Sequence, residues 1–241
     1  MFTHYRTQAF ILKESPRGET DKVFTVFTKD FGKIEILAKA VRKTKSKLRG
    51  NIPPFSISEI GFVQGKAYKI LTDALLVRDF ESMKKDLNKL KFAYRISGFL
   101  EKFIRAPEKD EAIWQHLKET FEVFDNPSLP FDYFSLIYFY FLWNLLSILG
   151  YRPQVYKCLN CQNKLKPDEL FFSARGGLIC KVCSKSEKSK LLQVNVNTVK
   201  ILREILKKNL SHLLKLKFKK EYQKPLKELS NFYFSFFPSE I

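Results

Sequence analysis

Every cysteine of this chain belongs to one of two Cys-x-x-Cys pairs, Cys158 with Cys161 and Cys180 with Cys183, and 18 residues separate the pairs. Two intervening residues let a tight turn aim both sulfur atoms at one ion. Two such turns supply four thiolates in tetrahedral geometry, which is the usual arrangement of a structural zinc site. Because four thiolates leave no open position for water, the spacing predicts one structural Zn²⁺ rather than a catalytic metal.

Two other interpretations of the cysteines remain open at this stage, redox-active pairs and thiols without metal. His212 is expected to be a surface or packing residue rather than a further ligand. None of the three histidines lies in the His-x-Glu motif that a zinc deaminase requires. Phosphate-binding loops, nucleophile elbows and His-Glu-x-x-His motifs are also missing from the sequence, so we expect a protein that is not an enzyme.

A second conspicuous segment is the basic loop, residues 39–50. Six of the eleven residues from Lys39 to Arg49 are basic and none is acidic. Like charges repel one another, so these side chains become favourable only when phosphates replace their counterions. Five phosphate contacts on a single strand predict a slope of roughly −3.5 in log K against log[salt]. The candidate nucleic-acid-binding residues are Lys39, Arg42, Lys43, Lys45, Lys47 and Arg49.

Composition alone also allows a solvated charged loop or an import signal. Phe31 and Phe55 flank the loop and are of a type that stacks on bases, but we expect both to pack in the core. The whole chain has a net charge of +18. Residues 1–80 carry 15 basic and 8 acidic side chains, and residues 181–241 carry 14 and 5, whereas residues 81–150 are close to neutral. This distribution favours a polyanionic partner held at the two basic regions.

The elements that must position these residues change in type along the chain. Short β-prone segments separated by Gly, Pro and Asp dominate the first 80 residues, and five strands in so short a length predict a small closed barrel of the OB type. The expected strands are 6–13, 21–28, 33–38, 56–63 and 67–77. Helical periodicity then begins near Met83 and predicts a first helix that ends before Pro107 and a second over 109–125. Two more helices are predicted near the C-terminus, one over 195–208 with Asn197 or Thr198 as N-cap and one over 224–237.

Residues 133–149 form an apolar run of 17 residues without a charge. A membrane span needs about 20 apolar residues, and Ser135, Asn144 and Ser147 interrupt this run. We therefore expect the central helix of an α-helical bundle, with a membrane span or a partner groove as alternatives.

The predicted fold class is α+β and multidomain, with an N-terminal five-stranded OB barrel, an α-helical bundle domain and an inserted zinc-ribbon-like module that contains the four cysteines. Gly176 and Gly177 suit the turn between the strands of this ribbon. The predicted domains are 1–80, the OB-fold nucleic-acid-binding domain; 81–150, the first part of the helical domain; 151–190, the zinc-binding module; and 191–241, the basic C-terminal part of the helical domain.

These motifs occur in an order that resembles the RecO family of bacterial recombination-repair mediators. The resemblance runs through "GETD" (18–21), "FGKI" (31–34), "AKAVRKTKSKLRG" (38–50) with "PF" (54–55), "LGYRP" (149–153), and the two Cys-x-x-Cys pairs with "FS" and "GG" between them. It covers about 185 residues. The chain departs from the family pattern at Ala40 and Gln162, where the family commonly has Gly.

The resemblance implies the same barrel, helical and zinc-binding organisation, and a bacterial DNA repair and recombination function. It further implies binding of single- and double-stranded DNA, annealing of complementary strands, action with RecR, and help in loading the RecA recombinase onto strands coated by single-strand-binding protein. Cysteine usage fits the cytoplasm, association with the nucleoid is expected of a DNA-binding mediator, and the N-terminal residues show no signal-peptide pattern. An RNA-binding factor built from a barrel and a ribbon, or a membrane-associated basic protein, are the alternative functions.

Overall fold

The computed structural model describes residues 3–104, 107–167, 170–216 and 218–237. The chain forms two compact units, Met1–Pro127 and Ser128–Ile241. The first contains the barrel and three helices, and the second contains the remaining helices and a small sheet with the four cysteines. This division does not test the four predicted domain boundaries, which stay predictions.

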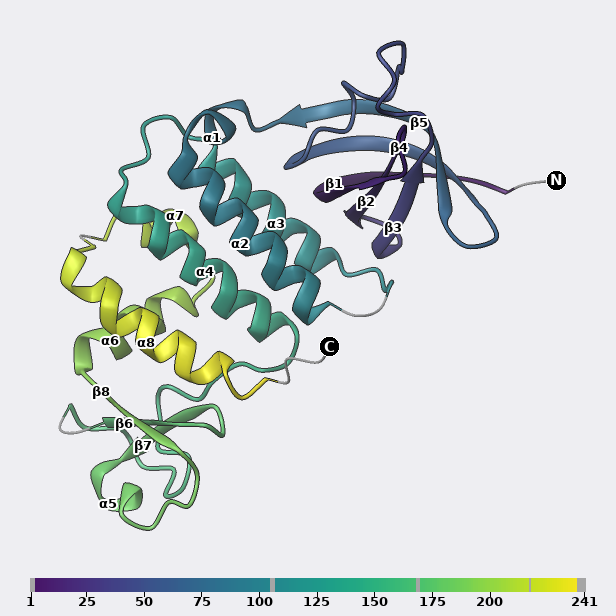
Figure 1. Ribbon diagram of the computed structural model, residues 1–241. Helices are drawn as coiled ribbons and strands as arrows, with labels where there is room; N and C mark the ends of the chain where they lie inside the picture. The colour runs from purple at the N-terminus through teal and green to yellow at the C-terminus, as the bar shows by residue number, and fades with distance from the viewer. Residues whose placement is uncertain (1–2, 105–106, 168–169, 217, 238–241) are drawn as a thin grey trace. The chain divides into compact units, whose positions relative to one another are not determined.

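Five strands of the first unit close into a barrel in the order β1-β2-β3-β5-β4, with β4 paired to β1 (Figure 1). β3 and β5 run parallel, and every other pair is antiparallel. This topology confirms the predicted OB-type barrel. The strands are β1 (His4–Arg17), β2 (Asp21–Thr28), β3 (Gly32–Ala38), β4 (Ser56–Gln64) and β5 (Lys69–Asp79).

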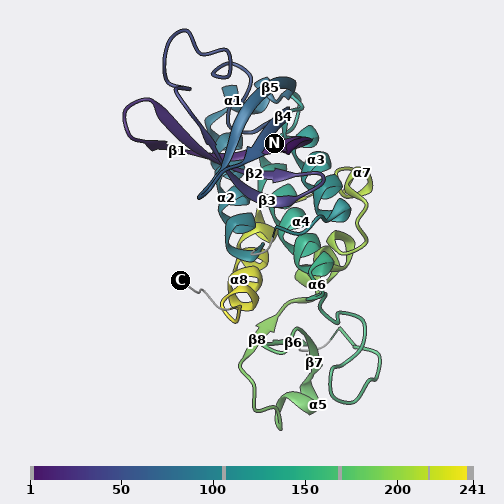
Figure 2. The same cartoon turned by 90° about the vertical axis from the view of Figure 1, so that its right-hand side faces the viewer.

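Alternation of side chains explains how the barrel closes around its core. In β3 the side chains of Ile34, Ile36 and Ala38 point inward and are buried, while Glu35 between them is exposed. The first strand is longer than the expected 6–13. Its last residues continue to pair with β2 up to Arg17 opposite Asp21, so the two strands extend as a ribbon (Figure 2).

Three helices follow the barrel, α1 (Glu81–Lys85), α2 (Leu87–Phe103) and α3 (Glu111–Phe124). The prediction of one continuous helix from Met83 was wrong, because the chain breaks at Asp86. The Asp86 carboxylate accepts hydrogen bonds from the backbone N–H groups of Asn88 and Lys89 and so caps a new helix.

An aromatic cluster joins these helices to the barrel. The ring of Phe10 in β1 lies 4.5 Å from that of Phe121 in α3, and Phe80 packs against both. The Ser97 hydroxyl of α2 donates to the carbonyl of Leu12 at 2.9 Å. Barrel and helices therefore share one core in this unit.

The second unit is built around α4 (Asp132–Ile148), whose residues from Leu136 to Leu146 are all buried. Its neighbours supply polar as well as apolar contacts. Trp143 donates to the Ser230 hydroxyl and stacks on Tyr233 at 5.3 Å between ring centroids. The Asn144 amide donates to the Ile205 carbonyl. The predicted buried central helix is confirmed within this unit.

The helical segments towards the C-terminus of this unit are α6 (Val196–Ile205), α7 (Leu210–Leu213), the 3₁₀ turn η1 (Lys220–Tyr222) and α8 (Gln223–Phe234). The predicted N-cap of α6 at Asn197 or Thr198 was wrong. Asn195 occupies that position, and its side chain accepts from the backbone N–H of Thr198. The expected last helix over 224–237 ends at Phe234.

The remaining part of this unit is a three-stranded sheet in the order β7-β6-β8 with the short helix α5 beside it (Figure 2). Its elements are β6 (Leu170–Ser173), β7 (Gly177–Cys180), α5 (Lys181–Ser184) and β8 (Leu191–Val194). The turn between β6 and β7 passes through Gly176, whose φ of 85° suits glycine. The predicted ribbon is therefore present, with β8 as a third strand.

Candidate nucleic-acid interface and metal centre

The basic loop connects β3 to β4, and apolar side chains anchor it to the barrel. Val41 and Ile52 are 2% and 3% exposed and belong to the barrel core, and Leu48 packs against the same core. The charged residues lie on either side of Val41 and Leu48 along the chain. Because these apolar side chains face the barrel core, the charged side chains face solvent. All six predicted basic side chains are exposed, namely Lys39, Arg42, Lys43, Lys45, Lys47 and Arg49.

The start of the loop is hydrogen-bonded to the turn between β1 and β2. The Ala40 N–H donates to Oδ1 of Asp21 at 2.8 Å, and the Arg42 N–H donates to the Thr20 carbonyl at 2.9 Å. The Arg42 guanidinium also donates to the Gly18 carbonyl at 3.3 Å. Residues 18–21 thus hold the loop, a role that sequence reasoning did not assign to "GETD".

The end of the loop is fixed by Asn51. Its side-chain amide donates to the Lys47 carbonyl at 2.9 Å, and its backbone N–H donates to the Leu48 carbonyl at 3.0 Å. Its own carbonyl accepts from the Ser58 hydroxyl at 2.6 Å. The loop is therefore bound to the barrel at both ends, so its path is defined although it contains no strand or helix.

Ala40 has a left-handed backbone with φ of 53°. This is the first of the two positions where the chain departs from the Gly of the RecO pattern. A residue with Cβ pays about 1 kcal/mol or more for this conformation, which glycine adopts freely. The hydrogen bond from the Ala40 N–H, with one from the Thr20 hydroxyl, lowers the pKa of Asp21. The Asp21 side chain is therefore charged when it holds the loop.

Within the part of the chain that the structure describes, no ion pair joins any of the six basic side chains to a carboxylate. Other basic side chains of the barrel do form ion pairs. Arg6, Lys13 and Lys22 each pair with Glu or Asp. The six side chains are therefore exposed and available to an external polyanion. Among them, Lys39 also acts electrostatically on Asp21 and helps to lower the pKa of that carboxyl.

Of the two aromatic residues that flank the loop, Phe55 is buried in the core as expected, and Phe31 is partly buried and packs against the core. Phe55 is 1% exposed and lies against Phe121, and Phe31 packs against Tyr5 and Phe62. The Phe55 ring is therefore not available for stacking.

The sulfur atoms of Cys158, Cys161, Cys180 and Cys183 all lie within 4.8 Å of one another. Four thiols in this arrangement could hold a metal ion. The Sγ atoms of Cys161 and Cys180 are 4.0 Å apart, so the two Cys-x-x-Cys pairs meet at one point.

The first pair lies in a turn closed by backbone hydrogen bonds. The Gln162 N–H donates to the Cys158 carbonyl, and the Cys158 N–H donates to the Asn163 carbonyl, both at 3.0 Å. Gln162 has φ of 58°. Gln162 is the second position where the RecO pattern commonly has Gly. Ala40 and Gln162, the two positions that differ from this pattern, therefore both have a left-handed backbone.

The second pair begins at the end of β7 and continues into α5. The Leu159 N–H of the first turn donates to the Leu178 carbonyl of β7 at 2.9 Å, which brings the two turns together. Gly177 is needed at this contact, since a Cβ there would lie 2.8 Å from the Gln154 carbonyl oxygen and 2.9 Å from Leu159.

The thiols of the cluster differ in acidity. Burial raises the pKa of Cys158, but the backbone N–H groups of Cys161, Cys180 and Asn160 point at its sulfur and bring its pKa down to about 6. The hydrogen bond that Cys183 shares with Cys180, together with burial, raises the pKa of Cys183 to about 12. Cys158 therefore forms a thiolate easily, whereas Cys183 holds its proton until a cation binds.

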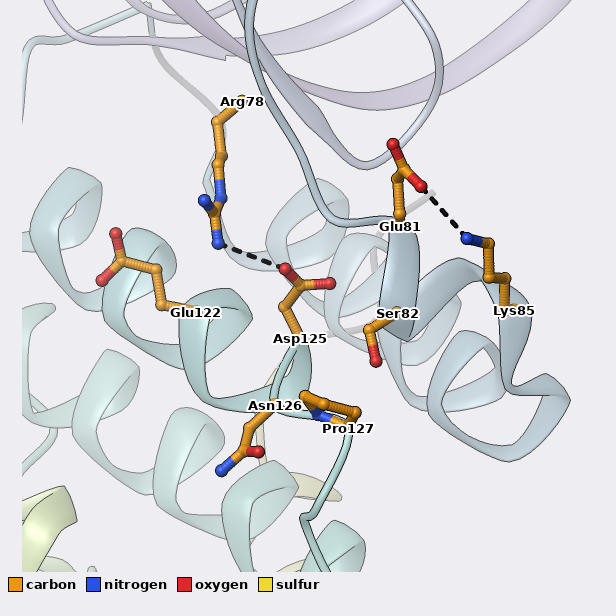
Figure 3. A pocket seen from close by; sticks show the side chains of 8 residues that line it. All are labelled: Arg78, Glu81, Ser82, Lys85, Glu122, Asp125, Asn126 and Pro127. Atoms are coloured by element: carbon orange, nitrogen blue, oxygen red, sulfur yellow. Dashed lines mark hydrogen bonds and ion pairs between the residues drawn. The ribbon is translucent and has the colours of Figure 1, made fainter.

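The first unit also has a surface pocket of about 670 Å³ where α1 meets the end of α3 (Figure 3). Both of its cations are paired with carboxylates that also line it, and a further carboxylate, Glu122, pairs with Lys118 outside the lining. Arg78 contacts Asp125 at 3.2 Å, Lys85 contacts Glu81 at 3.1 Å, and the Met83 N–H donates to Asp125. The pocket therefore has no surplus positive charge and differs from the basic loop.

Comparison with known proteins places this architecture in a family. A model described as Recombination protein O N terminal matches residues 1–80, and one described as Recombination protein O C terminal matches residues 84–236. The chain belongs to the RecO family. The first match covers the barrel strands, and the second covers the helices and the cysteine cluster.

Individual RecO relatives match over most of the chain. The DNA repair protein RecO of Dehalococcoides mccartyi strain CBDB1 is 34% identical over 218 residues, which are 90% of this chain and 84% of the relative. The protein of the same name from Caldanaerobacter subterraneus subsp. tengcongensis is 30% identical over 215 residues, which are 89% and 82% of the two chains. A third, from Thermodesulfovibrio yellowstonii, is 29% identical over 220 residues, which are 89% of this chain and 85% of the relative.

The structure also bears on the membrane alternative for this RecO-family chain. None of the helices in the described residues has both the length and the apolar content required to cross a bilayer. The apolar run at 133–149 corresponds to α4, whose residues from Leu136 to Leu146 are buried.

Proposed function

We propose that this chain is a DNA-binding mediator of recombinational repair and not an enzyme. It binds single- and double-stranded DNA, anneals complementary strands and, with RecR, helps load the RecA recombinase onto strands coated by single-strand-binding protein. RecO family membership supports a role in DNA repair and recombination. The structural observation that carries the proposal is the set of six exposed, unpaired cations on an anchored loop.

The chemistry of the loop favours phosphates over bases. Lys and Arg on an exposed loop neutralise phosphates and release counterions, whatever the sequence of the strand. Contact with the backbone alone suits a protein that must act on any damaged sequence, and it suits annealing because the bases stay free to pair. The proposed contact residues are Lys39, Arg42, Lys43, Lys45, Lys47 and Arg49, within a DNA-binding domain of residues 1–80.

The proposed cofactor is one structural Zn²⁺ held by Cys158, Cys161, Cys180 and Cys183. A tetrahedral ion with Zn–S bonds of about 2.3 Å places its sulfur atoms about 3.8 Å apart. The 4.0 Å separation of Cys161 and Cys180 is close to this value. Four thiolates close the ion to water, so its contribution is to hold the two turns of the module together. Reduced thiols and a DNA target together support a cytoplasmic, nucleoid-associated location.

Strand annealing on DNA coated by single-strand-binding protein tests the proposal. Complementary strands, each coated, are mixed with the purified protein, and duplex formation is followed by fluorescence energy transfer. We expect annealing well above the spontaneous rate, and a large loss when Lys43, Lys45 and Lys47 are changed to Glu. Annealing no faster than the spontaneous rate would contradict the proposal.

Competition between DNA and RNA strands of equal length is the second measurement. The charge pattern of the loop is compatible with either polymer, so this measurement separates the proposed function from the RNA-binding alternative. Displacement of bound DNA by lower concentrations of RNA than of unlabelled DNA would favour that alternative.

A further inference from the structure

We propose that Tyr68 and Arg17 form a stacking platform for an unpaired base at the end of the barrel where three connections meet. This inference rests on the proposed function and deepens it. The basic loop explains how phosphates are held, whereas the platform distinguishes a single strand from a duplex.

The platform joins two connections that are far apart in sequence. Arg17 is the last residue of β1, before the turn into β2, and Tyr68 is the last residue of the connection between β4 and β5. The Arg17 guanidinium carbon lies 4.2 Å from the centroid of the Tyr68 ring. The pair therefore brings the β1–β2 and β4–β5 connections into contact.

The basic loop reaches the same place through Arg42. Its backbone N–H donates to the Thr20 carbonyl and its guanidinium donates to the Gly18 carbonyl, both in the β1–β2 turn. Three connections thus meet around Arg17, Arg42 and Tyr68. In OB barrels the connections between strands 1 and 2 and between strands 4 and 5 are those that bind oligonucleotides.

The side chains at this place have the chemistry of a single-strand site. Arg17 is exposed and Tyr68 is partly exposed, so their planar groups are accessible to solvent. Planar guanidinium and aromatic groups both stack on bases without regard to sequence. Lys66, two residues before Tyr68, is exposed and adds positive charge.

Acidic groups nearby do not cancel this charge. Glu19 is exposed at the tip of the β1–β2 turn, and Asp21 lies two residues further on. The Asp21 carboxylate is already engaged by the Ala40 N–H and the Thr20 hydroxyl. The cations at the meeting point, Arg17, Arg42 and Lys66 with Lys39 beside them, outnumber these two carboxylates.

The platform offers a ring for base contact besides Phe55, which is buried, and Phe31, which is partly buried against the core. Tyr68 offers a ring at the meeting point itself. An exposed cation–π pair contributes only about 0.5–1 kcal/mol to folding, so the pair has modest value as a purely structural clasp. Bases of an intact duplex are stacked inside the helix and do not reach the ring, so the platform acts on single strands.

Abasic DNA provides the test, because it keeps the phosphates and removes the bases. Affinities are measured by fluorescence anisotropy for a thymidine oligonucleotide, an abasic oligonucleotide of equal length and a duplex. The proteins are the parent chain, Tyr68→Leu, Tyr68→Phe and Arg17→Lys, with Tyr94→Leu as the matched control. Tyr94 is 59% exposed on α2, and its ring packs on the buried Phe55 at the far end of the β3–β4 connection rather than on Arg17 or Tyr68.

We expect the parent to bind the intact strand about tenfold more tightly than the abasic strand. Tyr68→Leu should remove this difference and leave affinity for abasic strand and duplex unchanged. Tyr68→Phe and Tyr94→Leu should behave as the parent, since both keep the ring at position 68. Arg17→Lys should reduce the difference without changing the salt dependence, because it keeps the charge and loses the plane.

Two results would overturn the platform. One is a parent chain that binds intact and abasic strands equally well. The other is a Tyr68→Leu variant that either has no effect or weakens all three ligands equally, which would mean that the pair only clasps the connections. Failure of the proposed function looks different, because the parent would then bind none of the three ligands.

Discussion

The backbone N–H of Ala40 donates a hydrogen bond of 2.8 Å to Oδ1 of Asp21, and this bond fixes the point where the basic loop leaves β3. The contact joins the left-handed backbone of Ala40 to a carboxyl whose pKa the hydrogen bond lowers. A loop whose six cations form no ion pair in the described chain thus begins at a bond to a carboxylate. The position of the basic loop therefore depends on a carboxyl group that titrates in acid.

Reversal of charge in the middle of the loop should weaken DNA binding. Changing Lys43, Lys45 and Lys47 to Glu removes three phosphate contacts, so the slope of log K against log[salt] should become shallower by about 2 for a single strand. The measurement is a salt titration of affinity. Lys91, Lys109 and Lys118, all exposed in the same unit, changed together to Glu, form the control. An equal loss in both triple variants would show that only net charge matters.

Replacement of Ala40 by Gly should stabilise the protein. Glycine accepts φ of 53° without a Cβ clash, although it also gains entropy in the unfolded chain, so we expect a net gain of about 0.5 kcal/mol in the free energy of unfolding. Urea denaturation measures it. Thr44→Gly is the control, since Thr44 lies in the same loop without a positive φ and should lose stability. A loss at Ala40 as large as that at Thr44 would refute the account.

Stability of the barrel should fall in acid because of Asp21. Its pKa in the folded protein is lowered, so its stabilising contribution is complete above the unfolded value of about 3.9 and is lost as pH falls through the lower folded value. Asp21→Asn keeps an acceptor for the Ala40 N–H but does not titrate. Unfolding followed from pH 6 to pH 2 should show a smaller acid dependence in this variant than in the parent. Parallel curves for the two proteins would argue against the role of this carboxylate.

Purified protein should contain about one zinc ion per chain, measured by elemental analysis. Changing Cys161 and Cys180 to Ala should abolish zinc content, while the barrel keeps its thermal transition because it lies in the other unit. Ligand thiols must lose protons, so zinc affinity should fall as the pH is lowered. Full zinc content in the double variant would exclude the four-cysteine site.

Much of the fold could be predicted because its signals are local. Alternation in "KIEILA" places Ile34, Ile36 and Ala38 inside, and the spacing of the cysteines brings four sulfur atoms together, as the structure shows. The six basic side chains that were predicted to contact nucleic acid are exposed, and the contact itself stays a prediction. These features depend on neighbours in sequence or on a ligand geometry that fixes the spacing.

The remaining features depend on contacts between distant residues. Nothing local to Asp86 shows that it ends one helix and starts another, because Met83 and Leu87 continue the apolar period across it. The role of "GETD" appears only when Asp21 meets Ala40, and the pairing of Arg17 with Tyr68 requires the barrel to close. The N-cap of α6 was misplaced because Asn195 and Asn197 are equally good candidates by type.

The apolar anchors of the basic loop, Val41, Leu48 and Ile52, carry its attachment to the barrel, while its charged residues make no ion pair in the described chain. Folding and the proposed polyanion contact thus rest largely on different residues of one segment. Natural variation at the charged positions other than Arg42, whose guanidinium bonds the Gly18 carbonyl, should change the strength of binding in small steps with little effect on stability. Variation at the anchors would alter both properties at once, so the two sets of positions should evolve at different rates.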